Sequence, residues 1–204
     1  SAGTRCYLAV RGGFDIAPSF GSSSTVLREK IGGINGDKLQ AGDYLPCCAD
    51  KTGNHYRLAE TDQPVYGDSA RLRVVTGYQQ AAFAPLQQWR FFNSDYQLSE
   101  RCDRMGFRLE GETVHSDMVG MLSEGICHGA IQIPADGQPI VLMNDRQTIG
   151  GYPKIGSVIF HDTARLAQLS PGAKVRFEEI SIEQAHNIHC LEQARFQRTA
   201  LQPC

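Results

Sequence analysis

The sequence lacks several features that would each point to a class of protein. It has no apolar run of about 18 residues, which a transmembrane helix requires. Its Lys and Arg residues are scattered, and the net charge of -2 provides no basic face of the kind that binds nucleic acid. We therefore expect no membrane and no nucleic acid among the partners of this chain.

Motifs for metal, redox and nucleotide chemistry are also missing. No C-x-x-C pair occurs, which argues against a structural zinc site and against a thioredoxin-type redox pair. The cysteines number seven, an odd count, and Cys47 adjoins Cys48, so a disulfide framework is not favoured and we expect a reducing cytoplasm. The P-loop pattern G-x-x-x-x-G-K-[ST] is absent, so any nucleotide is bound by another kind of site.

Glycine and proline, in contrast, are plentiful. Many of the 21 glycines and 9 prolines bound short apolar runs, a pattern typical of mainly β folds. The run at residues 140–143 is wholly apolar, so we expect a strand that is buried on both faces. The full set of expected strands is residues 5–10, 72–75, 106–109, 129–133, 139–143, 157–160 and 174–178.

Helices are expected in a few places. Residues 78–92 show helical spacing, with Pro85 either kinking the helix or lying in its first turn. Asp162 is a candidate N-cap for a short helix. The clearest helix spans residues 181–198, where Ser181 and Gln184 form a capping box. Its inward stripe is expected to comprise Ile182, Ala185, His189, Leu191 and Phe196.

The chain is also expected to divide into two parts. Residues 47–68 are polar and irregular, which is typical of a boundary. We therefore expect an N-terminal module at residues 1–68 and a second, larger domain at residues 69–204.

The most informative segment is a hairpin followed by a polar loop. Asp136-Gly137 is a typical hairpin turn pair, and it precedes the apolar strand at 139–143. In the loop that follows, Gly150-Gly151 would permit positive φ and close approach of backbone N–H groups to a ligand.

The same loop carries four side chains that are suited to amide chemistry. Asp145, Thr148, Tyr152 and Lys154 supply a carboxylate, a hydroxyl, a phenol and a cation within ten residues. Such a set can orient an amide and stabilise a developing oxyanion. From spacing alone, a purely structural, hydrogen-bonded loop is the somewhat more favoured alternative.

Three blocks of sequence resemble one family. Residues 138–153 (QPIVLMNDRQTIGGYP) closely resemble a signature of the biotin-dependent carboxyltransferase family, also called the allophanate hydrolase subunit 2 family. Residues 7–15 (YLAVRGGFD) and 104–111 (RMGFRLEG) are similar to two further blocks of it. The family includes the C subunit of bacterial 5-oxoprolinase complexes, which this chain resembles most, and the carboxyltransferase region of urea carboxylase. The resemblance extends over essentially the whole chain.

The resemblance carries expectations about fold and partners. It implies a mainly β, cyclophilin-like barrel with a few short helices and a C-terminal helix, and it implies that an N-terminal stretch usual in the family is absent here. It also implies a small B subunit that is similar to a kinase inhibitor, and in the 5-oxoprolinase case a separate A subunit. ATP is the implied cofactor, with no site assigned, and no biotin is expected to be attached to this chain.

The resemblance also implies an activity. The leading expectation is the C subunit of an ATP-dependent 5-oxoprolinase-type complex, which opens 5-oxoproline to glutamate by acting on an N–C=O group. One alternative is biotin-dependent carboxyl transfer to a urea-like acceptor. The other is a non-catalytic regulator that binds a kinase-inhibitor subunit.

The expected catalytic residues are Asp145, Tyr152 and Lys154, with Lys154 supplying positive charge and Asp145 accepting hydrogen bonds from a substrate nitrogen. For Arg104, a surface ion pair with Asp103 or Glu110 is an open alternative. No metal ligands are expected, because His186, His189 and Cys190 would spread over different faces of a helix. The expected substrate-binding residues are Asn144, Thr148, Gly150, Gly151, Gln132 and Arg104.

Two departures from the family pattern lie near these residues. Residues 76–79 (TGYQ) stand where the family usually shows Pro-Gly-Pro-Gln, and His128 stands where a proline is common. Because of these two departures, the resemblance does not determine which substrate this chain would bind.

Overall fold

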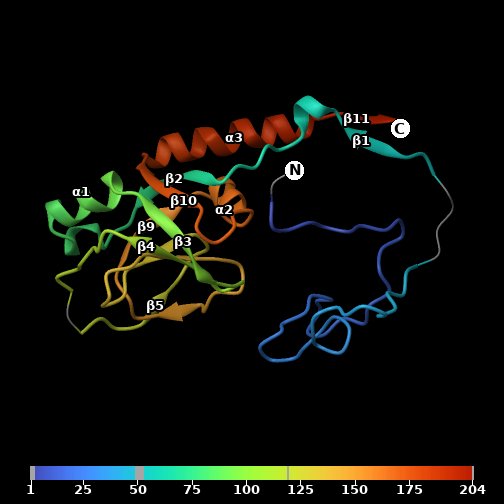
Figure 1. The fold of residues 1–204 in the computed structure, drawn as a ribbon, viewed down its shortest axis with the longest axis horizontal. Coiled ribbons are helices and arrows are strands. Elements are labelled where there is room, and N and C mark those ends of the chain that lie inside the picture. Colours follow the sequence, from blue (N-terminus) through green and yellow to red (C-terminus); the bar gives the residue numbers. More distant parts are fainter. Residues whose placement is uncertain (1–2, 49–52, 119, 204) are drawn as a thin grey trace. The chain divides into compact units, whose positions relative to one another are not determined.

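A computed structural model describes residues 3–48, 53–118 and 120–203 (Figure 1). The expected boundary at 47–68 therefore includes four residues, 49–52, that lie outside the described ones. The chain forms two compact units, one of Ser1–Arg5 with Leu58–Leu201 and one of Cys6–Arg57 with Gln202–Cys204. The division into an N-terminal module at residues 1–68 and a domain at residues 69–204 stays a prediction.

The larger unit is built on a barrel. Among the described residues, seven strands close in the order β10-β2-β9-β6-β7-β4-β3. The β10–β2 pair is parallel, and the other neighbouring pairs are antiparallel. The expected mainly β barrel is thus confirmed. Its strands are β2 (Ser69–Thr76), β3 (Tyr96–Cys102), β4 (Gly106–Gly111), β6 (Ala130–Gln132), β7 (Ile140–Leu142), β9 (Lys154–Val158) and β10 (Lys174–Glu179).

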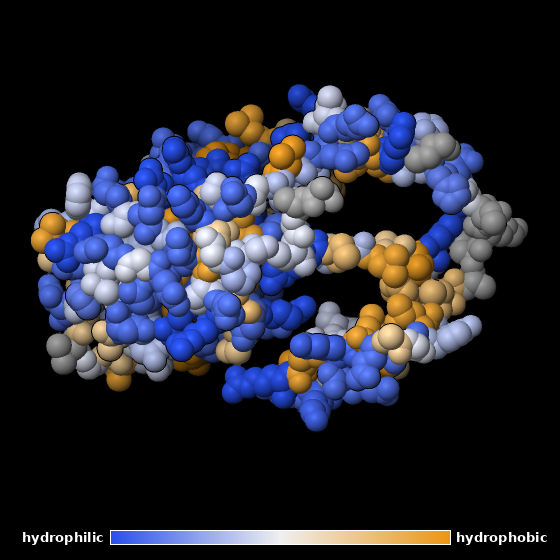
Figure 2. Space-filling model, in the orientation of Figure 1, coloured by the Kyte–Doolittle hydropathy of each residue, from blue (hydrophilic) through white to orange (hydrophobic). Residues whose placement is uncertain are grey.

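Alternating side chains fill the interior of this barrel. In β10, Val175 and Phe177 are buried while their neighbours in the strand are exposed, as a strand with one solvated face requires. The Phe177 ring stacks on that of Phe91 with 4.3 Å between centroids, and Tyr96 meets it edge-on. On the face of this unit that Figure 2 shows, most of the surface residues are hydrophilic.

Most expected strands coincide with observed ones. The β6–β7 pair forms the expected hairpin, closed by a hydrogen bond from the Gly137 N–H to the Pro134 carbonyl at 2.9 Å. Val141 and Leu142 of β7 are both buried, so the prediction of a strand covered on both faces is confirmed. The strand expected at 157–160 overlaps only the end of β9, since a helix begins at Phe160. The strand expected at residues 5–10 is wrong, because that stretch has no strand partner.

The helices differ from expectation mainly at their first turns. A short 3-10 turn, η2 (Gln80–Ala82), comes before α1 (Pro85–Asn93), so the helix expected at 78–92 starts later and Pro85 lies in its first turn. The helix α2 (Phe160–Leu166) has no side-chain cap. Asp162 does not cap it, because its carboxylate is buried and accepts hydrogen bonds from the Arg73 backbone and guanidinium at 2.7–2.8 Å.

The C-terminal helix, α3 (Ile182–Arg198), begins at the expected capping box of Ser181 and Gln184. Its expected inward stripe is wrong. None of its described residues is buried, and Ile182, Leu191 and Phe196 are each more than two thirds exposed. None of the helices in the described part of the chain is both long and apolar enough to cross a membrane.

The smaller unit consists mainly of turns. Its isolated bridges join Phe14 to Cys47, Ser19 to Ser22 and Val26 to Ile31. The remaining elements of the chain are short: β1 (Tyr56–Leu58) with β11 (Leu201–Pro203) as a two-stranded sheet, the 3-10 turn η1 (Glu60–Asp62), and β5 (Glu124–Gly125) with β8 (Ile149–Gly150) as another.

Candidate functional site

The site is assembled where the two-stranded β5–β8 sheet meets the start of β9. Strand β8 belongs to the loop at 144–154, and its antiparallel pairing with β5 sets Gly150 opposite Glu124. Lys154 is the first residue of β9 and lies opposite Gln132 of β6 in the barrel. The loop therefore connects a small outlying sheet to a fixed barrel strand.

Lys154 forms an ion pair with Glu124. Its ammonium also donates a hydrogen bond to the Gly125 carbonyl at 3.1 Å, so both partners come from β5. The Gln79 side chain ties the pair together: its oxygen accepts from the Lys154 backbone N–H at 2.7 Å, and its amide donates to the Glu124 carboxylate. The Lys154 side chain is 11% exposed and that of Glu124 30%, so the ammonium is the more enclosed of the two charges.

Tyr78 adds a phenol to this cluster. The Lys154 ammonium lies 5.7 Å from the centre of the Tyr78 ring, within the range of a cation–π contact. Hydrogen bonds from Lys154 and Tyr78 lower the pKa of Glu124, and the hydrogen bond to Glu124 raises the pKa of Tyr78. Near neutral pH the carboxylate is therefore ionised and the phenol keeps its proton.

Two hollows open beside the pair. The first, which we call the slot, has a volume of about 340 Å³, within the range of small-molecule sites. Three of its lining residues are glycines, so much of its wall is backbone. Within it, the Cys127 thiol and the Ser157 hydroxyl lie 3.2 Å apart. The residues that line the slot are Gly77, Tyr78, Gln79, Gly125, Cys127, Lys154, Gly156 and Ser157. The second hollow, of about 540 Å³, shares Tyr78 and Gln79 and includes Glu124.

Asp145 lies apart from Lys154. Its carboxylate accepts two hydrogen bonds from Arg104, at 2.5 and 3.0 Å, in a bidentate pair. Among the described residues, no ion pair or hydrogen bond joins Asp145 to Lys154, and Asp145 does not line the slot. Asp145 and Lys154 therefore pair with different side chains, Arg104 and Glu124, and do not face each other across a shared ligand site.

Of the two loop glycines, Gly150 has a steric role instead of the expected conformational one. Neither Gly150 nor Gly151 has positive φ, so that expectation is wrong. A Cβ atom on Gly150 would lie only 2.5 Å from the Ile126 Cδ1 atom and 3.0 Å from the Gln132 Nε2 atom. Gly150 therefore permits close packing of β8 over the barrel.

The other expected site residues differ in how far they are buried. Gln132 is buried, and its Nε2 atom has no hydrogen-bond partner, a state that costs about 1–3 kcal/mol unless a water or ligand supplies one. Asn144, Thr148 and Tyr152 are exposed and do not line the slot. Their roles in catalysis and substrate binding stay predictions.

Sequence reasoning did not single out Glu124 or Gln79 as site residues. Glu124 is thirty residues from its partner and lies on a strand of two residues, too short for a periodic signal. Tyr78 and Gln79 were visible only as the departure at 76–79. The other departure, His128, is half-buried outside the slot, and burial lowers the pKa of its imidazole.

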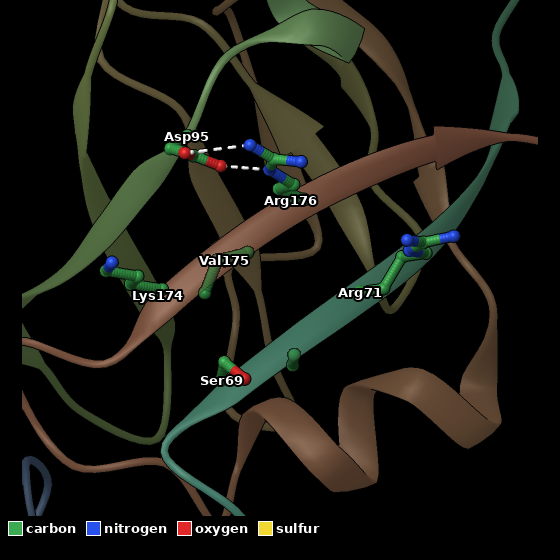
Figure 3. Close-up of a pocket in the computed structure, with 7 residues that line it drawn as sticks. Ser69, Arg71, Asp95, Lys174, Val175 and Arg176 are labelled. Atoms are coloured by element: carbon green, nitrogen blue, oxygen red, sulfur yellow. Dashed lines mark hydrogen bonds and ion pairs between the residues drawn. The ribbon is translucent and has the colours of Figure 1, made fainter.

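A metal ion or a triphosphate would each need a cluster of suitable side chains. Among the described residues, no group of three or more His, Cys, Asp or Glu side chains lies close enough to hold a metal ion. A hollow on the outer face of β2 and β10 is lined by Arg71, Lys174 and Arg176 (Figure 3). Carboxylates already pair with two of these cations, Arg176 with Asp95 and Arg71 with Glu178.

Comparison with known proteins places these features in a family context. The family described as carboxyltransferase domain, subdomain A and B, matches residues 1–179. The chain is 39% identical to the C subunit of 5-oxoprolinase from Escherichia coli (strain K12), over 97% of this chain and 63% of that protein. It is 30% identical to a putative urea carboxylase of Emericella nidulans, over 89% of this chain and 16% of that protein. The chain thus spans less than two thirds of these relatives' length.

A solved structure supports the same fold. The crystal structure of the protein TTHA0988 superimposes with a TM-score of 0.70 at 33% identity, over 83% of this chain and 33% of that one.

Proposed function

The chain belongs to the carboxyltransferase domain family, subdomain A and B, and from this premise we propose that it acts as the C subunit of an ATP-dependent 5-oxoprolinase-type complex. Such a complex opens 5-oxoproline, a lactam, to glutamate. The observation that carries the proposal is the slot, where an enclosed ammonium group faces a small, uncharged space. The 39% identity to the C subunit of a 5-oxoprolinase supports the choice of substrate.

In this proposal Lys154 is the catalytic residue of the chain. Its ammonium donates a hydrogen bond to the lactam oxygen and stabilises the negative charge that develops there when the carbonyl carbon is attacked. Glu124 and Gln79 hold that ammonium in place, so little reorganisation is needed during the reaction. The glycine backbone of the slot leaves room for a flat N–C=O group.

The proposed reaction also requires ATP. We propose that ATP is bound by another subunit of the complex, either the small B subunit or the A subunit, because two of the three cations in the hollow of Figure 3 already pair with carboxylates. No step is routed through ATP here.

Reconstitution tests this function. The chain combined with the A and B subunits should release glutamate and phosphate from 5-oxoproline. Lys154→Met, which keeps the length of the side chain but removes its charge, should lower kcat by about 100-fold or more, since one preorganised donor is typically worth that much. Lys174→Met, on the exposed face of β10, is the matched control and should leave kcat unchanged.

An unchanged kcat in the folded Lys154→Met protein would contradict the role given to Lys154. Absence of glutamate release from the complete complex would contradict the function. If the chain bound the B subunit tightly without any turnover of lactam, a regulatory role would replace the catalytic one.

Biotin-dependent carboxyl transfer is the second candidate, and the identity to a putative urea carboxylase favours it. The slot would then hold a urea-like acceptor. Incubation with a carboxylated biotin-carrier domain and urea should produce carboxylated urea if this candidate is right. No product from that mixture, with glutamate release from 5-oxoproline, would eliminate it.

A further inference from the structure

The positive charge in the slot is already balanced within the fold. Lys154 is the one charged residue among the slot's described lining residues, and the others are glycine, tyrosine, glutamine, cysteine and serine. Its counter-ion, Glu124, does not line the slot; it lines the second hollow, which has Tyr78 and Gln79 in common with the slot. A ligand in the slot therefore meets an ammonium group whose net charge is cancelled close by.

The ammonium nevertheless keeps hydrogen-bonding capacity. A lysine side chain has three N–H donors. One is directed to the Glu124 carboxylate and one to the Gly125 carbonyl. The third side of the ammonium faces the Tyr78 ring, whose centre lies 5.7 Å from the nitrogen, a longer contact than the other two. A ligand oxygen in the slot can therefore take over this third donor.

A donor of this kind treats carbonyls and carboxylates differently. A neutral carbonyl oxygen accepts a hydrogen bond without repulsion from Glu124. A carboxylate would place a second negative charge next to Glu124, and like charges a few ångströms apart repel each other. It would also have to compete with a carboxylate that Tyr78 and Gln79 already hold.

We propose that Glu124 is a specificity-determining residue, which makes the slot select an uncharged amide or lactam carbonyl and reject a carboxylate. This inference rests on the proposed function, because both place an N–C=O group at Lys154. It adds that any carboxylate of the same substrate is recognised outside the slot. Glu124 thus has two effects, since it positions the ammonium and excludes anions from it.

The test compares two ligands of equal size and different charge, acetamide and acetate. Cys127 reports on both, because its thiol is exposed and lines the slot. The full chain is treated with methyl methanethiosulfonate, a small neutral thiol reagent, and modification of Cys127 is followed by peptide mass spectrometry. Ionic strength is held constant with chloride. The ligand concentration that halves the modification rate measures binding.

Acetamide should protect Cys127 in the wild-type chain at lower concentration than acetate. In Glu124→Gln, protection by acetate should improve, so that the ratio of the two half-protection concentrations shifts toward acetate by about tenfold or more. Glu112→Gln makes the same change in net charge at a residue outside the slot, in a surface pair with Arg90, and should leave the ratio unchanged. Tyr78→Phe keeps the ring and the charges, and should also retain the preference for acetamide.

Two results would overturn the inference: a wild-type slot that prefers acetate, or a folded Glu124→Gln protein with an unaltered ratio. Neither depends on turnover. If the complex fails to release glutamate while the ratio shifts as expected, the proposed function fails and the selectivity stands. If glutamate is released but the ratio does not move, only the inference about Glu124 fails.

Discussion

At the scale of single residues, the structure separates charges that look alike in the sequence. Lys154 was identifiable because it follows a distinctive loop, but its partner Glu124 was not. An ion pair between residues thirty positions apart depends on how two short strands are placed, and no local pattern encodes that placement. Asp145 was identified for the same reason as Lys154, yet it pairs with Arg104 instead. Residue type and motif located the cation, whereas tertiary structure decided what faces it.

Asp162 is another residue whose partner the sequence did not reveal, and it leads to a prediction about stability. Its side chain is fully buried and accepts three hydrogen bonds from Arg73, so it joins α2 to β2. Asp162→Asn removes the charge and leaves the Arg73 guanidinium without its counter-ion. We expect the free energy of unfolding to fall by about 3 kcal/mol, which is typical when one partner of a buried pair is removed. Urea denaturation followed by circular dichroism measures the change.

The control for this prediction is Asp95→Asn, which breaks a similar bidentate pair with Arg176 on the exposed face of β10. Solvent screens that pair, so the loss of stability should be much smaller. Equal losses in the two variants would show that burial of Asp162 is not the source of its contribution.

At the scale of elements, periodicity predicted most of the barrel strands. It missed β3, where an irregularity in pairing after Leu98 interrupts the alternation of buried and exposed side chains. The alternation in β10 and the apolar run in β7 are direct consequences of how the barrel is filled. The capping box of α3 was also evident, because it depends on two residues three apart. What failed was the inward stripe of α3, since apolar spacing indicates which residues share a face but not whether anything covers it. Strands β5 and β8 were missed because two residues are too few to show a period.

The β5–β8 sheet is nonetheless the element on which the site depends, and Gly150 of β8 tests this. Gly150→Ala should push β8 away from Ile126 and Gln132, because the new Cβ atom would lie within 3.0 Å of both side chains. Displacement of β8 moves its partner β5 and hence Glu124 and the Gly125 carbonyl. We expect kcat of the reconstituted complex to fall by about tenfold, as small misplacements in an active site do.

Gly151→Ala, at the next residue along the chain, is the matched control. A Cβ atom there would have the Ser123 hydroxyl as its nearest neighbour, at 3.4 Å, so the substitution adds the same methyl group without a clash. Gly151 does not line the slot, so this variant should leave kcat of the complex close to that of the wild type. A larger effect from Gly151→Ala than from Gly150→Ala would contradict the idea that packing under β8 sets the geometry of the site.

At the scale of the whole molecule, the barrel core and the slot belong to the same compact unit. The principal core cluster runs from Leu72 to Phe177, and the slot is lined by residues from Gly77 to Ser157. All of them lie within Leu58–Leu201. Seven strands closed into a barrel satisfy their own backbone hydrogen bonds, so the core and slot do not depend on hydrogen bonds from residues 6–57 for their closure.

A chain that starts at Leu58 should therefore fold and keep its slot. We expect one cooperative urea transition, together with the same order of protection of Cys127 by acetamide and acetate as in the 204-residue chain. The shortening also removes Thr4 and Arg5, which form hydrogen bonds with Gln168 and Ala167 and place the Arg5 guanidinium over the Phe107 ring. Stability should therefore fall, but the barrel should stay folded, because each such contact at an exposed site contributes about 0.5–1.5 kcal/mol. If the shortened chain instead unfolded without a cooperative transition, residues before Leu58 would be part of the folding unit. If it folded but lost protection by acetamide, the slot would require groups from those residues.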